Sequence, residues 1–197
     1  MNISQTIIEY AYKNNGMINA SDLKEMGILH GNLDYLVKKG ELEKVSRGVY
    51  ILPDIWEDEL YNLQSRFKRG IYNLETALYL YDLTDRTPSH YSMAFPKGYN
   101  LKNPKSESVF CTQENEVFYA KGVSSVKTPG GNIVQSYDME RTICDLIRKK
   151  NSLDIQLVSE SLKRYMRRTD KNIPKLSEYS KILKVDNKLR IYMEVLM

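Results

Sequence analysis

The chain has 197 residues, of which 42% are hydrophobic and 27% are charged, and its formal net charge is +4. This composition is typical of a globular protein with room for one or two domains. No apolar run is long enough to span a bilayer, and the first residues lack the charged-then-apolar order of a signal peptide. We therefore expect a cytoplasmic protein without a membrane partner.

The first forty residues are predicted to form three short helices. A helix over residues 2–13 carries apolar side chains at helical spacing. A second helix is expected to begin after Asn19, a good N-cap with Asp22 three positions later, and to end at Gly27. The third runs from about His30 to Lys39, with its leucines on one face.

A β-ribbon is predicted directly after these helices. Residues 42–45 and 49–52 alternate in hydropathy, and Ser46-Arg47-Gly48 supplies the turn between them. Helix, turn, helix and ribbon in this order is the layout of a winged helix-turn-helix. A helical hairpin and a β-hairpin that merely pack together form the competing interpretation, because the layout is partly generic.

Polar side chains off the apolar face favour the DNA-binding interpretation. A helix of about ten residues is about 15 Å long, which suits a major groove about 12 Å wide. Asn pairs with adenine, Lys reaches guanine or phosphate, and a wing reaches phosphates or the minor groove. Asp34 argues against this, because its carboxylate repels phosphate unless it turns away or accepts from a cytosine amine. The predicted DNA contacts are His30, Asn32, Tyr35, Lys38, Lys39, Lys44, Ser46 and Arg47.

The rest of the chain is expected to form a connecting helix and a second domain. The helix, within residues 53–69, spans about Ile55 to Lys68, and Trp56 is expected to pack between the domains. Further helices are expected at 74–81, 138–149, 153–167, 174–183 and 187–196, and strands at 90–95, 108–112, 117–120, 123–128 and 133–136, with a polar loop at 96–106.

These elements predict an α+β fold. An N-terminal winged helix-turn-helix domain covers residues 1–52. After the connecting helix, residues 70–197 form a mixed α/β C-terminal domain with a small sheet and several helices.

Positive charge is concentrated in the last third of the chain. Residues 1–52 are balanced, whereas residues 141–197 hold fourteen Lys and Arg against seven Asp and Glu. This favours a surface that follows a DNA or RNA backbone, although basic residues near helix C-termini are also favoured by the helix dipole. The candidate C-terminal basic face consists of Arg141, Arg148, Lys149, Lys150, Lys163, Arg164, Arg167 and Arg168.

The sequence contains no recognisable catalytic constellation. HExxH, GxSxG, P-loop and GxGxxG patterns are all missing, and there are only two histidines. Cys111 and Cys144 lie in apolar surroundings and are expected to be buried thiols rather than a disulfide. We therefore expect a protein that is not an enzyme, with no cofactor and no metal.

Several segments resemble a known family. They are DLKEMG at 22–27, VKKGELEKVSRGVY at 37–50, ETALYLYDLTDRTP at 75–88 and YDMERTICDLI at 137–147. In these segments the chain resembles the AbiEi-type antitoxins of bacterial type IV toxin–antitoxin systems, over nearly its whole length. Relatives tend to carry Ser followed by Arg at the start of the recognition helix, where this chain has Leu29-His30-Gly31. That departure shifts the expected contacts toward Asn32, Lys38, Lys39 and Arg47.

The resemblance implies a DNA-binding repressor. Such a protein binds inverted repeats in its own promoter, and its C-terminal domain opposes a nucleotidyltransferase-like toxin in phage abortive infection. Type IV implies that no stable complex with the toxin is required. Two alternatives are a ligand-sensing winged-helix transcription regulator unrelated to a toxin and an enzyme that acts on nucleotides.

Overall fold

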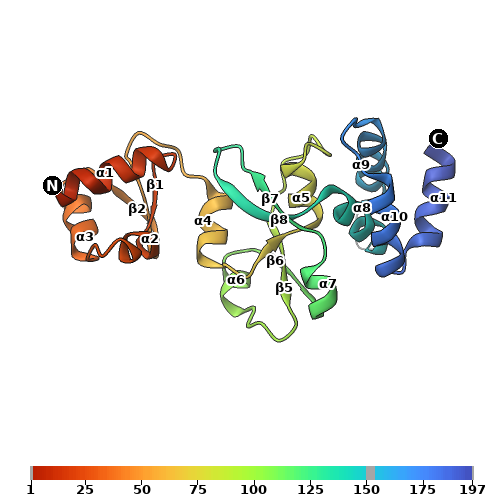
Figure 1. Cartoon of the computed structure of the whole chain (residues 1–197), viewed down its shortest axis with the longest axis horizontal. Coiled ribbons are helices and arrows are strands. Elements are labelled where there is room, and N and C mark those ends of the chain that lie inside the picture. Colours follow the sequence, from red (N-terminus) through yellow and green to blue (C-terminus); the bar gives the residue numbers. More distant parts are fainter. Residues whose placement is uncertain (1, 150–153, 197) are drawn as a thin grey trace. The chain divides into compact units, whose positions relative to one another are not determined.

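The computed structural model describes residues 2–149 and 154–196, with side chains to Glu194. The chain divides into two compact units. Unit 1 comprises residues 1–68 and 127–134, and unit 2 comprises residues 69–126 and 135–197. Figure 1 shows the elements of both units along the chain.

Unit 1 begins with a winged helix-turn-helix. Its elements are α1 (Ile3–Lys13), β1 (Met17–Asn19), α2 (Ala20–Glu25), α3 (Gly31–Lys38), β2 (Glu43–Ser46) and β3 (Val49–Ile51). The strands form an antiparallel sheet in the order β1-β3-β2. Apolar residues of α1, α2 and α3 pack with Tyr50 of β3 in one core, with Ile7, Leu23, Leu33 and Leu36 almost fully buried. The predicted N-terminal fold is confirmed, and β1 is an addition to it.

The second helix is capped differently from the prediction. Asn19 is its N-cap residue, but the side chain makes no capping hydrogen bond. Its Nδ2 instead donates to the hydroxyl of Tyr61 at 2.8 Å and to Asp22 at 3.3 Å. The tertiary contact with Tyr61, on the helix that follows the wing, therefore replaces the expected local one.

The connecting helix begins later than predicted. It is α4 (Glu59–Arg66), and the carboxylate of Asp58 caps it by accepting from the backbone N–H of Tyr61. Trp56 lies before the helix with 95% of its surface exposed, so the expected packing role was wrong.

Residues 127–134, the tip of the hairpin between β7 and β8, group with unit 1. There the amide of Asn132 donates to Asp58 at 2.9 Å, and the hydroxyl of Thr128 donates to the same carboxylate oxygen. Asn15 of the winged domain donates to Asn132 at 3.1 Å. Buried polar contacts thus hold the tip against α4 and the loop before β1.

Unit 2 is built on a five-stranded sheet in the order β6-β5-β4-β8-β7. The pairs β4–β8 and β5–β6 are parallel and β4–β5 is antiparallel, so the sheet is mixed. The strands are β4 (Ile71–Tyr72), β5 (Ser92–Pro96), β6 (Phe110–Glu114), β7 (Val123–Lys127) and β8 (Ile133–Tyr137).

Helices complete unit 2. They are α5 (Leu74–Leu80), α6 (Lys102–Ser106), α7 (Glu116–Ala120), α8 (Met139–Arg148), α9 (Ile155–Arg167), α10 (Ile173–Ile182) and α11 (Asp186–Leu196). The main core lies among α5, α8, α9 and α10. The predicted α+β class is confirmed. The strand expected at 117–120 was wrong, because Asn115 caps a helical turn there, and α6 lies in the expected polar loop.

Candidate nucleic-acid interface

Helix α3 presents one face to the core of unit 1 and one to solvent. Leu33 and Leu36 are almost fully buried, whereas Asp34, Tyr35 and Lys38 are exposed. Eight residues give a helix about 12 Å long, which matches the width of the major groove. The element predicted to read DNA is therefore open to solvent over its polar face within unit 1.

His30, directly before α3, is held by two neighbours. Its Nδ1 lies 3.3 Å from Asp34 Oδ2, and its Nε2 lies 3.2 Å from the hydroxyl of Tyr50. Because an ionised carboxylate only accepts hydrogen bonds, the geometry assigns the proton to Nδ1, and Nε2 then accepts from Tyr50. The carboxylate of Asp34 is thus occupied by His30, which lessens the objection raised by its charge.

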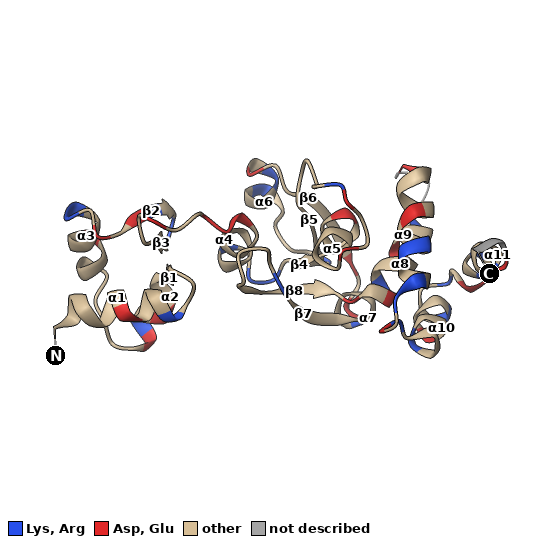
Figure 2. Ribbon diagram, turned by 90° about the horizontal axis from the view of Figure 1, so that it is seen from above, with Lys and Arg blue, Asp and Glu red and all other residues tan. Residues whose placement is uncertain are grey.

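The two lysines at the end of α3 differ in their surroundings. Lys39 Nζ lies 5.0 Å from the centre of the Tyr35 ring and 3.6 Å from Glu41 Oε1. The hydrogen bond with Tyr35, and then the charges of Tyr35 and Glu41, raise the pKa of Lys39. Lys38 is exposed and forms no ion pair among the described residues. Figure 2 shows basic residues at this end of the helix. Lys38 is therefore the lysine better placed for a phosphate.

The wing offers two exposed cations. Lys44 on β2 lies 5.9 Å from the centre of the Tyr50 ring, and Arg47 occupies the turn beside Gly48, whose φ is +78°. Ser46 is half-buried, and its hydroxyl donates to Asn62 Oδ1 of α4 at 2.7 Å. Lys44 and Arg47 are thus open to solvent on the wing, whereas Ser46 holds the wing to the following helix.

Comparison with known proteins relates the winged helix-turn-helix to a family. Residues 5–53 match the sequence model of the family described as "Transcriptional regulator, AbiEi antitoxin". Over these residues the chain is similar to AbiEi-type regulators, and this N-terminal part is hence called the AbiEi-type domain. The match runs from α1 to just beyond β3 and contains every predicted DNA-contacting residue. A transcriptional regulator family implies DNA binding as its general activity.

The AbiEi-type domain and the rest of the chain together resemble a solved structure. The crystal structure of the RV2827C protein from Mycobacterium tuberculosis aligns with a TM-score of 0.52 and 12% sequence identity, covering 100% of this chain and 81% of that chain. At this identity the likeness concerns the fold alone. No curated protein sequence matches the chain.

The AbiEi-type domain has one exposed candidate that the sequence interpretation missed. Leu29 precedes His30, and 77% of its surface is exposed. An apolar side chain at the start of a helix that lies in the major groove can contact the methyl group of thymine. Its signal in the sequence was an apolar residue outside the buried stripe of α3. Asn32, which was predicted, is only partly exposed, and its amide donates to the Leu29 carbonyl at 3.0 Å.

Outside the AbiEi-type domain, the predicted basic face needs correction at Arg141. This side chain has no exposed surface. Its Nε donates to Asp145 Oδ2 at 2.9 Å and its Nη1 donates to the carbonyl of Lys121 at 2.8 Å. Its guanidinium carbon lies 4.2 Å from the centre of the Tyr137 ring. Arg141 is therefore a buried structural cation of unit 2 and cannot contact a nucleic acid.

Most of the other predicted cations of this face are paired with carboxylates. Arg148 contacts Glu114 and Asp145, and Lys149 lies 3.9 Å from Glu114. Arg164 pairs with Asp85, and Arg168 pairs with Asp170 at 2.7 Å. Lys163 and Arg167 are exposed, and Lys150 lies outside the described residues. Ion pairs therefore neutralise much of the positive charge in the last third, and a continuous basic face is not observed over the described residues.

Clusters that could hold a metal ion and helices that could span a membrane are both missing from the described residues. They contain no group of three or more His, Cys, Asp or Glu side chains arranged to hold a metal ion. None of the helices described combines the length and the hydropathy that crossing a bilayer requires.

Proposed function

We propose that this protein is the antitoxin of a bacterial type IV toxin–antitoxin system, and that it represses its own operon by binding inverted repeats in the promoter. The observation that carries the proposal is the AbiEi antitoxin match over residues 5–53, which coincides with a winged helix-turn-helix whose α3 has an open polar face. The AbiEi-type regulator is expected to be non-enzymatic.

The polar residues of α3 and the wing divide into two roles. Lys38, Lys39, Lys44 and Arg47 bind phosphates and fix the register of the domain on the duplex. His30, Asn32 and Tyr35 approach base edges, and Leu29 adds an apolar contact. Ser46 supports this surface by holding the wing to α4.

The charges of the winged domain predict how strongly its binding to DNA depends on salt concentration. Residues 1–52 carry six Lys and Arg and six Asp and Glu, so non-specific attraction to DNA is weak. Two copies on an inverted repeat would place eight cations on phosphates, four from each copy. Eight phosphate contacts correspond to a slope of log K against log salt of about −7.

The C-terminal part, residues 70–197, is proposed to counteract a nucleotidyltransferase-like toxin without a stable complex. The resemblance of residues 75–88 and 137–147 to AbiEi-type antitoxins supports this role. The proposal assigns DNA binding to residues 1–52 and antitoxicity to residues 70–197, with residues 53–69 as the connection.

A two-part experiment on the full chain tests the proposal. Lys39→Ala combined with Arg47→Ala is expected to relieve repression of a promoter–reporter fusion, while co-expression still rescues cells from the neighbouring toxin. Lys13→Ala, which removes an exposed cation on α1, is the matched control and leaves both activities intact. Binding to the promoter no tighter than to a scrambled duplex would contradict the repressor role, and lack of rescue would contradict the antitoxin role.

A further inference from the structure

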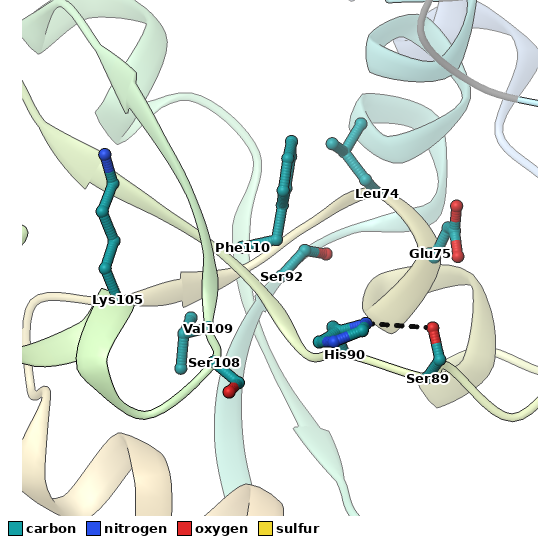
Figure 3. Close-up of a pocket in the computed structure, with 9 residues that line it drawn as sticks. All are labelled: Leu74, Glu75, Ser89, His90, Ser92, Lys105, Ser108, Val109 and Phe110. Atoms are coloured by element: carbon teal, nitrogen blue, oxygen red, sulfur yellow. Dashed lines mark hydrogen bonds between the residues drawn. The ribbon is translucent and has the colours of Figure 1, made fainter.

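Unit 2 contains a cavity that DNA binding does not use. Its volume is about 500 Å³, within the range of small-molecule sites. Residues at the start of α5, before and within β5, at the end of α6 and at the start of β6 line it (Figure 3). The lining residues are Leu74, Glu75, Ser89, His90, Ser92, Lys105, Ser108, Val109 and Phe110.

The wall combines an aromatic face with a cation. Phe110 lies on the edge strand β6 with 56% of its surface exposed, whereas Leu74 and Val109 are buried beside the cavity. Lys105 lies on the side of the view away from Glu75 and His90 in Figure 3, and it forms no ion pair among the residues that the structure describes. An exposed aromatic ring stacks on a flat ligand, and an ammonium group without an ion-pair partner binds the ligand's anionic group.

Polar groups complete the lining. His90 and Ser89 lie 3.1 Å apart through Nδ1 and the hydroxyl oxygen, and both face the cavity. Glu75 is the acidic residue of the lining, and its carboxylate is a hydrogen-bond acceptor for an N–H or O–H group. The anionic group of a ligand is therefore expected beside Lys105 and away from Glu75.

Buried hydrogen bonds fix the arrangement of the backbone segments beneath the cavity. Ser92 donates its hydroxyl to the carbonyl of Asn73 at 2.5 Å and its backbone N–H to Thr76 Oγ1 at 2.8 Å. The side chain of Asn73 donates to Thr112 Oγ1 at 2.8 Å. These bonds join α5, β5 and β6, so the cavity is preformed rather than a gap between loose segments.

Two lining residues also adopt a backbone conformation that L side chains avoid. Leu74 has a φ of +46° and Ser108 a φ of +58°. A bulky residue with positive φ is an outlier, and such outliers persist where the surroundings impose them, often at ligand sites. Both residues line this one cavity.

We propose that the cavity binds a small molecule that carries an aromatic ring and an anionic group. The ring stacks on Phe110, and the anion pairs with Lys105. His90 and the exposed hydroxyls of Ser89 and Ser108 make hydrogen bonds to the remaining polar atoms. Two kinds of compound share this chemistry, namely nucleoside monophosphates and aromatic carboxylates. This inference goes beyond promoter binding and antitoxicity and does not depend on either.

Titration calorimetry with the full chain tests the proposal. The probes are the four common ribonucleoside 5′-monophosphates, benzoate, salicylate and indole-3-acetate. The matched compounds each lack one feature. Adenosine lacks the anionic group, whereas inorganic phosphate and cyclohexanecarboxylate lack the aromatic ring. At least one aromatic anion is expected to bind at millimolar concentration or below, and its matched compound to bind at least about tenfold more weakly. Binding of nucleotides alone, or of carboxylates alone, identifies the source of the anion and supports the site.

Variants locate the binding. Phe110→Leu keeps an apolar side chain and removes the ring, and Lys105→Ala removes the cation, so each should weaken binding by about tenfold or more. Lys102→Ala, at the other end of α6 and outside the lining, should leave affinity unchanged. Both substituted side chains are exposed, and circular dichroism confirms that the variants fold. Failure of every aromatic anion to bind, or an affinity in both Phe110→Leu and Lys105→Ala that equals that of the wild type, overturns the proposal.

Discussion

The hydroxyl of Tyr50 lies 3.2 Å from Nε2 of His30, and the two rings meet edge to face with centres 6.1 Å apart. Tyr50 is fully buried in β3, the middle strand of the small sheet, whereas His30 stands at the start of α3. The contact therefore ties the residue directly before α3 to the wing. It fixes the orientation of the helix end that is proposed to approach base edges.

Tyr50→Phe is expected to weaken both folding and DNA binding moderately. The change removes the hydroxyl and leaves the ring packing, so the free energy of unfolding should fall by about 1 kcal/mol. Promoter affinity should fall as well, because His30 loses the partner that orients it. Urea unfolding and fluorescence anisotropy measure the two effects. Tyr12→Phe, on an exposed tyrosine of α1, is the control. Unchanged values of both quantities in Tyr50→Phe would show that the contact does not position the helix.

Arg141→Met is expected to destabilise unit 2 strongly. The substitution leaves Asp145 buried without its main cation, and breaking a buried pair in this way costs about 3–5 kcal/mol. Chemical unfolding followed by circular dichroism measures the loss. Arg167→Met on the exposed side of α9 should change the free energy of unfolding by less than about 0.5 kcal/mol. If the two variants are equally stable, Arg141 is not the structural cation described above.

Asp58→Ala is expected to loosen the hairpin tip of unit 1. The carboxylate caps α4 and accepts from Thr128 and Asn132, so its removal leaves buried donors unsatisfied and should cost about 2–4 kcal/mol. Hydrogen exchange should accelerate at residues 127–134 more than in α1. Asp54→Ala, at an exposed position nearby, should leave the exchange of the tip unchanged. Protection of the tip that survives in Asp58→Ala would contradict the role assigned to the carboxylate.

The thiol of Cys144 should make the stability of the protein fall at alkaline pH. Burial raises its pKa from 9.0 to about 12. Since the folded pKa is the higher one, the contribution is complete below pH 9 and is lost as the pH rises toward 12. Between these limits the stability of the wild type should fall, relative to Cys144→Ala, by roughly 1 kcal/mol per pH unit. Unfolding curves of the wild type and of Cys144→Ala at several pH values measure this difference. A difference that does not vary with pH would contradict the burial of this thiol.

Local sequence patterns predicted the fold where an element has an apolar face that extends over several residues. The helical spacing of Leu33 and Leu36 located α3, and Asp138 marked the start of α8, where its side chain accepts from the N–H of Arg141. Strand β1 was not predicted, because it has only three residues and pairs with β3, a strand distant in sequence. The segment at 117–120 has β-favouring residues, but the cap supplied by Asn115 makes it helical.

The candidate site was predicted in part for the same reason. Exposure of Tyr35, Lys38 and Arg47 follows from their position relative to the apolar stripe or in the turn. The contact of Ser46 with Asn62 depends on α4, and the burial of Arg141 depends on Asp145 and on the carbonyl of Lys121. The partners of Ser46 and of Arg141 cannot be predicted from composition. Counting charges alone therefore overestimated the basic surface of unit 2.

The salt dependence of promoter binding tests most directly whether α3 and the wing meet the phosphates of a duplex. For the full chain, Lys38→Ala combined with Arg47→Ala should reduce the slope of log K against log salt by about two for each bound copy. Lys13→Ala combined with Lys24→Ala, which removes two exposed cations of the same domain, should leave the slope unchanged. If the two double variants give the same slope as the wild type, or as each other, α3 and the wing are not the surface that binds DNA.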